Sequence, residues 1–335
     1  MPTIHDVARE SGVSISTVSR VIQGASNVLP ETRERVEEAI RRLDYHPNRL
    51  AQQFRTQQTR NILVIVPSIG NTFYSEILAG IESVANKHDY ALLLVDSHGK
   101  GDIEMRCCDM LAQKLVDGII TFSTGIQKDK LKQLARQYPI VIACRYFADT
   151  TIPNVTIDNI KAIKDITGYL LNLGHKRVCY LAGPSDILLY QDRLGGFQEA
   201  LRERGLKVDP DLILHCDSSI RGGYDAVSAL LNARRDFTAL VASGDTMAIG
   251  AIRALNDAGL KVPEDVAVAG FDDISMSTLF TPTLTTVRQP KYQIGARAME
   301  KLLDLISGKE LSNWRDVLNY ELVIRESSGG LVSAK

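Results

Sequence analysis

Four residues near the start of the chain have the types and the spacing to read the edges of DNA bases. They are Ile15, Ser16, Ser19 and Arg20, which share one side of a helix if this stretch is helical. A short polar side that carries one cation suits base edges and the phosphates beside them in a major groove. A plain structural helix pair would show the same apolar spacing, so this segment alone leaves both interpretations open.

A second group of reactive side chains follows the apolar runs farther along the chain. Hydroxyls, carboxylates and aromatic rings collect there, a set that suits a polyhydroxylated or sugar-containing small molecule. We expect Asp272 and Arg193 to contact such a ligand, because charged residues at strand ends in a cleft tend to be functional. We interpret Asp245 as a helix N-cap and Ser97 as part of a turn. The segments at the carboxyl ends of these predicted strands are Pro67–Thr72, Ser97, Ser123, Cys144 with Arg145, Gly183–Tyr190, Asp217, Ser243–Asp245 and Phe271–Asp273.

Two short helices joined by a glycine turn must hold the first group. Thr3 and Asp6 are typical of a capping box, Gly12 ends the first helix, and the Ser14 hydroxyl can cap the second. The apolar residues that pack these helices together are Val7, Ala8, Val13, Val18, Val21 and Ile22. A third helix starts at Pro30, where a missing N–H is tolerated. Its apolar side, which closes the small core, consists of Val36, Ala39, Ile40 and Leu43.

A segment of two helical turns follows this small core. Leu50, Ala51 and Phe54 share one side of a helix that would run from Asn48 to Phe54. A helix this short does not persist in water without a partner. The segment is therefore either a flexible linker, as residues 57–61 are expected to be, or a helix that folds on meeting DNA and a second subunit.

From Asn61 onward, apolar runs alternate with amphipathic stretches. Such alternation predicts parallel sheets covered by helices on both faces. The runs divide near Asp158 into two halves, which predicts two Rossmann-like lobes with a ligand beyond the carboxyl ends of the strands. The strand-like runs are Ile62–Val66, Leu92–Val95, Gly118–Phe122, Ile140–Ala143, Val178–Leu181, Leu212–His215, Ala239–Ala242 and Val266–Ala269. The helical stretches include Phe73–His88, Leu189–Glu203, Thr246–Asp257 and Tyr292–Ser307, and a late strand is expected over Val317–Ile324.

Composition places the chain among ordinary globular proteins. Its 335 residues suggest two or three domains, 44% of them are hydrophobic, and the net charge is −1. Residues 1–60 hold nine arginines, no lysine and seven acidic residues, a local excess of positive charge that favours phosphate contacts. Five cysteines lack metal-type or redox-type spacing, so we expect no metal site, no cofactor and reduced thiols. We see no secretion leader after Met1 and no run long enough for a membrane span, and therefore expect a cytoplasmic location without membrane contact.

The runs IHDVARESGVSISTVSRVI, TRERVEEAI and YHPNRLAQQ resemble the DNA-binding headpiece and hinge of the LacI/GalR family of bacterial transcription regulators. The resemblance implies a headpiece over residues 1–46 and a hinge helix with linker over residues 47–60. In that family paired hinge helices insert an apolar wedge, usually leucine, into the minor groove, and Phe54 stands at the matching place. The predicted DNA-binding residues are Thr3, Ser14, Ile15, Ser16, Thr17, Ser19, Arg20, Asn27, Asn48, Arg49, Ala51 and Phe54.

The rest of the chain resembles the effector-binding core of the same family. Blocks such as DRLGGFQEAL, GDTMAIGAIRALNDAGLKVPEDVAVAGFDD and PTLTTVRQP carry this resemblance, which implies a fold like that of type I periplasmic sugar-binding proteins. The core would span residues 61–335, with a first lobe of about 61–158 plus a C-terminal return and a second lobe of about 159–290. The predicted effector-binding residues are Phe73, Tyr74, Cys144, Arg145, Leu189, Tyr190, Arg193 and Asp272.

These features predict a DNA-binding transcription regulator, in most such cases a repressor, controlled allosterically by a sugar-type or nucleoside-type effector. Its partners would be a pseudo-palindromic operator, the effector and a second copy of the chain, and the protein would be associated with the bacterial nucleoid when bound. Relief of repression by the effector and repression that requires it are both compatible with the residues. A solute-binding protein would need an export signal, and none is visible. An α/β enzyme would need a catalytic motif, and the sequence contains none of the common ones. We therefore expect no catalytic residues.

Overall fold

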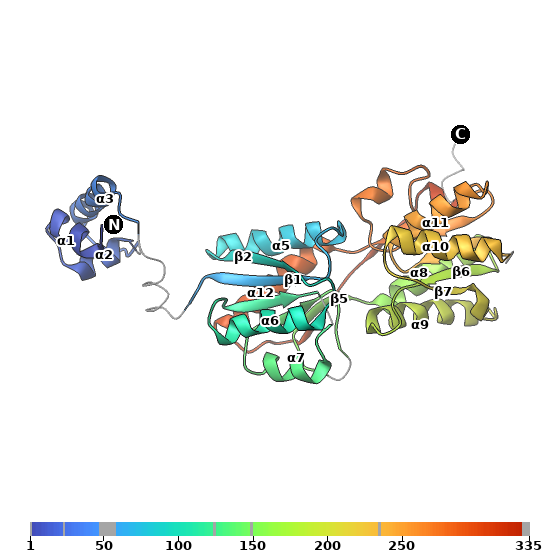
Figure 1. Ribbon diagram of the computed structural model, residues 1–335, viewed down its shortest axis with the longest axis horizontal. Helices are drawn as coiled ribbons and strands as arrows, with labels where there is room; N and C mark the ends of the chain where they lie inside the picture. Colours follow the sequence, from blue (N-terminus) through green and yellow to red (C-terminus); the bar gives the residue numbers. More distant parts are fainter. Residues whose placement is uncertain are drawn as a thin grey trace. The chain divides into compact units, whose positions relative to one another are not determined.

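The computed structural model describes residues 2–22, 24–46, 58–122, 125–147, 150–233 and 236–329. The chain divides into two compact units, Met1–Thr59 and Arg60–Lys335 (Figure 1). Each unit has its own hydrophobic core.

The first unit is built from three helices, α1 (Ile4–Ser11), α2 (Ile15–Ile22) and α3 (Pro30–Leu43). The capping box is confirmed, because Asp6 Oδ2 accepts hydrogen bonds from the Thr3 N–H at 2.9 Å and the Thr3 hydroxyl at 2.8 Å. Gly12 ends α1 at φ +66°, a conformation that costs glycine little. The Ser14 hydroxyl accepts from the Thr17 N–H at 3.2 Å and starts α2, also as predicted.

The core of this unit is the apolar set that the sequence indicates. The three helices each contribute one fully buried valine to a single hydrophobic cluster. These residues are Val7, Val18 and Val36. Tyr45 is also buried there, although the sequence pattern did not predict it as a core residue. Because α2 packs into this core through Val18 and Val21, its opposite side is not needed for packing and is exposed to solvent.

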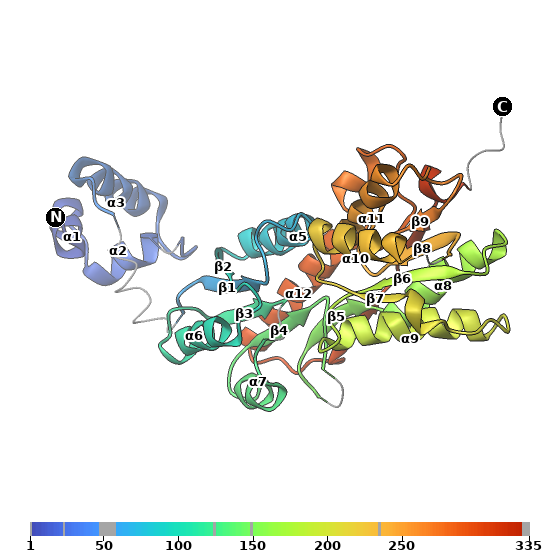
Figure 2. The same ribbon diagram turned by 45° about the vertical axis from the view of Figure 1, so that its right-hand side comes forward.

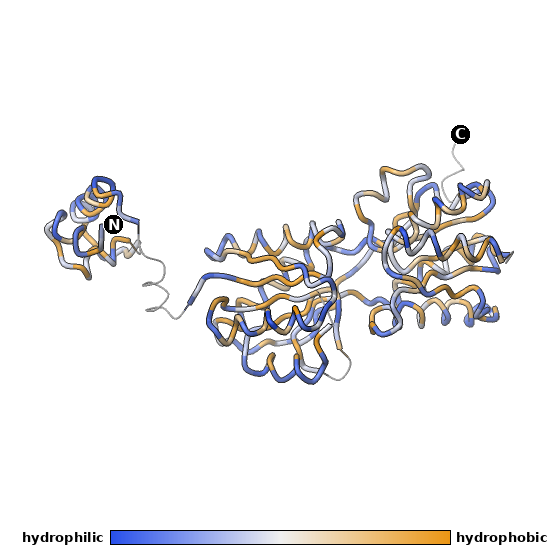
Figure 3. Tube along the Cα trace, in the orientation of Figure 1, coloured by the Kyte–Doolittle hydropathy of each residue, from blue (hydrophilic) through white to orange (hydrophobic). Residues whose placement is uncertain are grey.

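The first lobe of the second unit is a six-stranded parallel sheet in the order β11-β5-β4-β3-β1-β2. Its strands are β1 (Asn61–Val66), β2 (Ala91–Asp96), β3 (Gly118–Thr121), β4 (Ile140–Ala143), β5 (Asn154–Ile157) and β11 (Arg315–Leu318). Helices α5 (Phe73–Lys87) and α12 (Lys291–Ile306) cover one face, and α6 (Gly101–Ala112) and α7 (Lys128–Ala135) cover the other. The central strands β1 and β4 are hydrophobic along their length (Figure 3) and buried over Ile62–Val66 and Ile140–Ala143, as expected for strands covered by helices on both faces of the sheet.

The second lobe is a four-stranded parallel sheet in the order β7-β6-β8-β9. Its strands are β6 (Val178–Ala182), β7 (Ile213–His215), β8 (Ala239–Ala242) and β9 (Ala267–Ala269). Helices α8 (Asn159–Asn172) and α9 (Leu188–Arg202) pack together on one face, and α10 (Ile220–Asn232) and α11 (Asp245–Asp257) on the other (Figure 2). Three short 3₁₀ helices complete the lobe, η1 (Pro210–Leu212), η2 (Ser275–Thr278) and η3 (Glu326–Ser328).

The end of the chain differs from the predicted single strand over Val317–Ile324. Two strands are present instead, because β11 joins the first sheet while β12 (Glu321–Val323) pairs antiparallel with β10 (Thr286–Arg288). The 3₁₀ helix η3 then packs against β9 of the second lobe. The C-terminal return therefore serves both lobes. Strands β5 and β10 were not predicted, because their sequences NVTI and TVR contain polar residues and do not form the continuous apolar runs by which the other short strands were recognised.

The chain passes between the two lobes three times, after β5, before α12 and after β11. A continuous hydrophobic cluster accompanies these connections and includes Val64 and Val155 of the first sheet and Tyr180 and Val241 of the second. Because the carboxyl ends of both sheets face this junction, side chains that follow the strands of either lobe can meet there.

Candidate functional site

A pocket of about 180 Å³ lies where the two lobes meet. Both lobes line it, the first through the starts of its loops and α5, the second through α9 and the loop after β9. All eight predicted effector-binding residues line this one pocket. The complete lining is Pro67, Ser68, Asn71, Phe73, Tyr74, Phe122, Cys144, Arg145, Leu189, Tyr190, Arg193, Ser218, Asp272 and Gln289.

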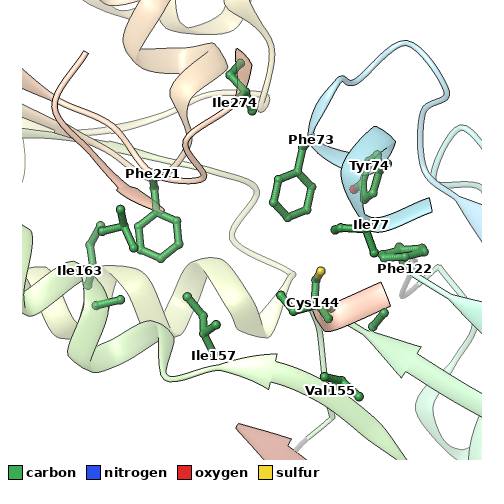
Figure 4. Packing of buried hydrophobic residues seen from close by; sticks show 14 of the residues in the cluster. Phe73, Tyr74, Ile77, Phe122, Cys144, Val155, Ile157, Ile163, Phe271 and Ile274 are labelled. Atoms are coloured by element: carbon green, nitrogen blue, oxygen red, sulfur yellow. The ribbon is translucent and has the colours of Figure 1, made fainter. Parts of the chain in front are cut away.

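The first-lobe wall of the pocket is aromatic. Phe73 and Tyr74, at the start of α5, meet edge to face with ring centroids 5.2 Å apart, and Tyr74 meets Phe122 in the same way at 5.2 Å. Figure 4 shows Phe73 and Tyr74 opposite Phe271, which comes from the second lobe. Burial raises the pKa of the Tyr74 hydroxyl, so this group stays neutral and able to donate a hydrogen bond. Flat apolar walls of this kind suit the faces of a sugar or a base.

Tyr190 supplies an aromatic ring from the second lobe, and its place depends on Gly183. A Cβ atom on Gly183 would lie 2.4 Å from the Tyr190 ring, closer than any real contact. Glycine is therefore required where β6 leads into α9, so that the ring can lie against the backbone. Leu189, one residue earlier, is buried and adds an apolar contact to the same side.

Asp272 provides the pocket's carboxylate. Its Oδ1 accepts a hydrogen bond from Gln289 Nε2 at 2.7 Å and lies 3.8 Å from Arg193 Nη2. Burial raises the pKa of Asp272 to about 6, although the Arg193 charge, the hydrogen bond from Gln289 and the Lys291 charge all act to lower it. The backbone of Asp272 has φ +115°, and that of Cys144 has φ +64°. Strained conformations in side-chain-bearing residues concentrate at functional sites, and two of them lie in this pocket.

Arg193 is both a lining residue and a structural partner. Its Nε donates to Asn159 Oδ1 at 2.9 Å, its Nη1 donates to the Ser243 carbonyl, and its guanidinium carbon lies 3.6 Å from the centroid of the Phe271 ring. With 3% of the residue exposed, Arg193 is fixed from several sides. Such fixation holds the cation beside Asp272 in one orientation.

The structure contradicts one of the strand-end predictions, that for Asp245. The interpretation of Asp245 as an N-cap is wrong, because Gly244 caps α11 and Asp245 is its first residue. The buried Asp245 carboxylate instead accepts hydrogen bonds from the Ile274 N–H, the Ser277 hydroxyl and the Thr286 hydroxyl. It thus supports the loop after β9 from below.

Ser97 belongs to a turn, as predicted, since its hydroxyl accepts from the Gly99 N–H at 3.2 Å. Asp217 also serves a turn, because its carboxylate accepts from the Ser219 N–H at 2.9 Å, and its neighbour Ser218 lines the pocket instead. Ser123 lies outside the described residues.

Sequence reasoning missed Gln289, Ser218 and Phe122 as pocket residues. Gln289 follows β10, which was itself not recognised, so its position at a strand end was hidden. Phe122 was assigned to the predicted strand, although β3 ends one residue before it. Ser68 and Asn71 also line the pocket. They lie inside the predicted strand-end range Pro67–Thr72, but were not among the individual residues predicted to bind the effector.

The predicted base-reading face lies on the outer side of α2. Ser16 and Arg20 are exposed, Ile15 is 40% exposed, and Ser19 is partly exposed. The Ser16 hydroxyl lies 2.7 Å from that of Ser14, which orients it at the start of the helix. Of the remaining predicted DNA contacts, Thr3, Ser14 and Asn27 are exposed and Thr17 is partly exposed. Asn48, Arg49, Ala51 and Phe54 lie outside the described residues.

Within the described ranges, no cluster of three or more His, Cys, Asp or Glu side chains is arranged to hold a metal ion. Among the helices of the described part of the chain, none is both long and apolar enough to cross a membrane.

Comparison with known proteins gives matches to both units. Residues 3–48 match the family described as bacterial regulatory proteins, lacI family. Residues 59–319 match the family described as periplasmic binding proteins and sugar binding domain of LacI family.

Full-length relatives match almost the whole chain. The HTH-type transcriptional regulator RegA of Clostridium saccharobutylicum is 38% identical over 97% of this chain and 99% of its own length. The HTH-type transcriptional repressor CytR of Escherichia coli K12 is 37% identical over 98% of this chain and 97% of its own. The Lac repressor dimer bound to operator and the anti-inducer ONPF has a TM-score of 0.88 and 30% identity, covering 98% of this chain and 99% of that one.

Proposed function

The chain belongs to the LacI family of bacterial regulatory proteins, and on this premise we propose which of its residues read DNA and which bind the effector. It is a DNA-binding transcriptional regulator of the repressor type, with an effector-binding core that resembles sugar-binding proteins. Its partners are operator DNA, a sugar-class or nucleoside-class effector and a second copy of the chain.

The pocket between the lobes is the effector site in this proposal. The observation that carries it is the convergence of all eight predicted residues, from segments more than 190 residues apart in the sequence, on one lining. Asp272 and Gln289 would accept and donate hydrogen bonds to ligand hydroxyls, and Arg193 would hold the carboxylate in place. Phe73, Tyr74, Leu189 and Tyr190 would contact the apolar faces, with Cys144 and Arg145 at the first-lobe side.

The effector is either a sugar or a compound that contains one, such as a nucleoside. The carboxylate and the amide suit vicinal hydroxyls, while the aromatic rings suit a sugar face or a nucleobase equally well. A volume of about 180 Å³ accommodates a small molecule and not a polymer. Effector-relieved and effector-dependent repression remain alternatives, because both need only a difference in effector affinity between two states.

Residues 1–46 form the DNA-binding headpiece in this proposal, residues 47–60 the hinge, and residues 61–335 the core. In the headpiece Ile15, Ser16, Ser19 and Arg20 would read base edges. The backbone contacts would come from Thr3, Ser14, Thr17, Asn27, Asn48 and Arg49, and Ala51 and Phe54 would reach the minor groove. A pseudo-palindromic operator follows, because a two-fold dimer presents two reading helices.

The protein would act without catalysis and in the cytoplasm, at the nucleoid when bound. The relatives reported above are transcription regulators, which supports a binding function and not turnover. Genomic DNA as the partner supports this location.

A thermal-shift panel of hexoses, sugar acids, sugar phosphates and nucleosides tests the effector site on the full chain. A compound that binds the native state at a hundredfold excess over its Kd raises the free energy of unfolding by about 2.7 kcal/mol. We expect at least one compound to raise Tm for the wild type and for Asp304→Ala, an acidic control outside the pocket lining. The same compound should raise Tm of Asp272→Ala by about half as much or less, because a tenfold loss of affinity lowers the stabilisation to about 1.4 kcal/mol. A shift of equal size in Asp272→Ala would place the site elsewhere.

A further inference from the structure

Lys291, at the first position of α12, has a buried ammonium group that the proposed ligand site does not use. The side chain is 4% exposed, although burial of an uncompensated charge is costly. Its Nζ donates to the Asp272 carbonyl at 3.1 Å and to the Asp273 carbonyl, and it forms an ion pair with Glu76 Oε1 at 3.1 Å. An ammonium has three donors, so these three acceptors account for all of them.

Two of these acceptors belong to the strained loop of the pocket. Asp272 and Asp273 are consecutive residues with φ +115° and +51°, an arrangement unfavourable for residues with a side chain. The Asp273 carboxylate is bound by Arg288 at 2.7 Å and by Arg325 at 2.6 Å, both in the second lobe. A cation that binds both carbonyls stabilises the same turn from its backbone side.

The third acceptor lies on the first lobe. Glu76 is in the first turn of α5, whose Phe73 and Tyr74 line the opposite wall of the pocket. Lys291 therefore joins the two walls, through backbone on one side and a carboxylate on the other. It differs in this from Arg288 and Arg325, whose contacts with the loop remain within the second lobe.

Helices α5 and α12 are packed closely enough to respond together. A Cβ atom on Gly80 would lie 2.1 Å from the Tyr292 carbonyl oxygen, and one on Gly295 would lie 1.9 Å from the Ile77 carbonyl oxygen. Backbones in such contact cannot slide independently. A displacement of Lys291 should therefore move α5 and α12 together, and not only the lysine side chain.

We propose that Lys291 is a positioning residue that ties the Asp272 loop to α5, so that displacement of either wall of the pocket is transmitted to the other. A regulatory role for this tether rests on the proposed function, because it assumes that effector binding displaces one wall of the pocket. The tether itself is a property of the protein without ligand or DNA, and can be measured in that state.

Hydrogen exchange of the full chain, measured by mass spectrometry without effector or DNA, tests the tether. The readout is a peptide that spans residues 271–275, where the Asp272 N–H is bonded to the Val287 carbonyl and the Ile274 N–H to Asp245. The informative variant is Glu76→Gln, because Glu76 is 56% exposed and we expect the substitution to leave the fold intact. The matched control is Glu82→Gln, another exposed glutamate on α5.

We expect Glu76→Gln to speed exchange of this loop about two- to fivefold, the range of a partly exposed ion pair, although the substitution is in the other lobe. Lys291→Met should speed it by about tenfold or more, because two carbonyls also lose their donor. Peptides from β8 should be unchanged in both variants, as should the loop in Glu82→Gln. In the Lys291→Met background, Glu76→Gln should add nothing, since its partner is gone.

An unchanged loop in Glu76→Gln, or an equal effect of Glu82→Gln, would overturn the proposal. If Lys291→Met does not fold, the two glutamate variants still decide the question. Failure of the tether would leave effector and operator binding untouched, and failure of those activities would leave the exchange result standing. The two proposals can therefore fail separately.

Discussion

The proposed base-reading face of α2 and the proposed effector-binding loop over residues 271–274 are built in opposite ways. Side chains on α2 such as Arg20 are exposed, and the helix is held by the core on its other side. The loop is instead held by cations and an amide that bind Asp272 and Asp273, and by the buried Asp245 carboxylate, which accepts from the Ile274 N–H. Substitutions on α2 should therefore change binding alone, whereas those around the loop should change stability and binding together.

The largest effect is expected at Asp245. Its carboxylate accepts three hydrogen bonds in a fully buried position, so Asp245→Ala leaves three donors without a partner. We expect the free energy of unfolding to fall by about 2–4 kcal/mol. Urea unfolding of the full chain measures it. A loss under about 0.5 kcal/mol would show that the loop does not depend on this support.

The pH dependence of stability sharpens the same point. Burial, together with the Asp272 charge, raises the pKa of Asp245 from 3.8 to about 7. The folded chain therefore binds this proton more tightly than the unfolded chain does, so the free energy of unfolding falls as pH rises from about 4 to about 7. Asp245→Asn should show a smaller decline over this window than the wild type. Equal declines would contradict the assignment of the proton to Asp245.

Asp272→Ala should separate ligand response from DNA binding. The substitution removes the pocket's carboxylate, so a panel compound that binds the wild type should lose about tenfold or more in affinity, measured by calorimetry. Operator affinity without effector should stay within about twofold, because the headpiece is a separate unit. Unaltered ligand affinity would move the site away from this loop.

Arg20→Ala tests the other side of the comparison. Loss of one base or phosphate contact should weaken operator binding by about 1–3 kcal/mol per reading helix. The change in the free energy of unfolding should stay within about 0.5 kcal/mol, because Arg20 is exposed. A large loss of stability with unchanged operator affinity would assign Arg20 a structural role.

Ser16→Ala should have the smallest effect. The hydroxyl lies 2.7 Å from that of Ser14 and so is partly satisfied without DNA. We expect operator affinity to fall by about 0.5–1.5 kcal/mol, the usual worth of one neutral hydrogen bond. Fluorescence anisotropy with a labelled operator measures the change, and a loss larger than that of Arg20→Ala would reverse the assigned order of contacts.

Local signals in the sequence predicted most of this architecture. The capping pair Thr3 and Asp6, the turn at Gly12 and the long helices have local causes, and the structure confirms them. The pocket lining was predictable because parallel strands deliver their carboxyl ends to one edge. Gln289 and strands β5 and β10 were not predicted, since the strand sequences NVTI and TVR contain polar residues and their pairing partners lie elsewhere in the chain.

Asp245 shows why charged residues are the hardest to interpret. A carboxylate before an apolar run is typical of an N-cap, and nothing local distinguishes that role from burial against a distant loop. The distinguishing partners, Ser277 and Thr286, lie more than thirty residues later in the chain. Lys291 was hidden for the same reason, because its acceptors come from two other segments.

The most direct test of the central claim is operator binding by the full chain at moderate salt, with and without the panel compound that raises Tm most. We expect a pseudo-palindromic duplex to bind at least about a thousandfold more tightly than a random duplex, and the compound to change that affinity about 5- to 150-fold in either direction. Equal affinity for palindromic and random duplexes, with every panel compound and without any, would contradict the claim.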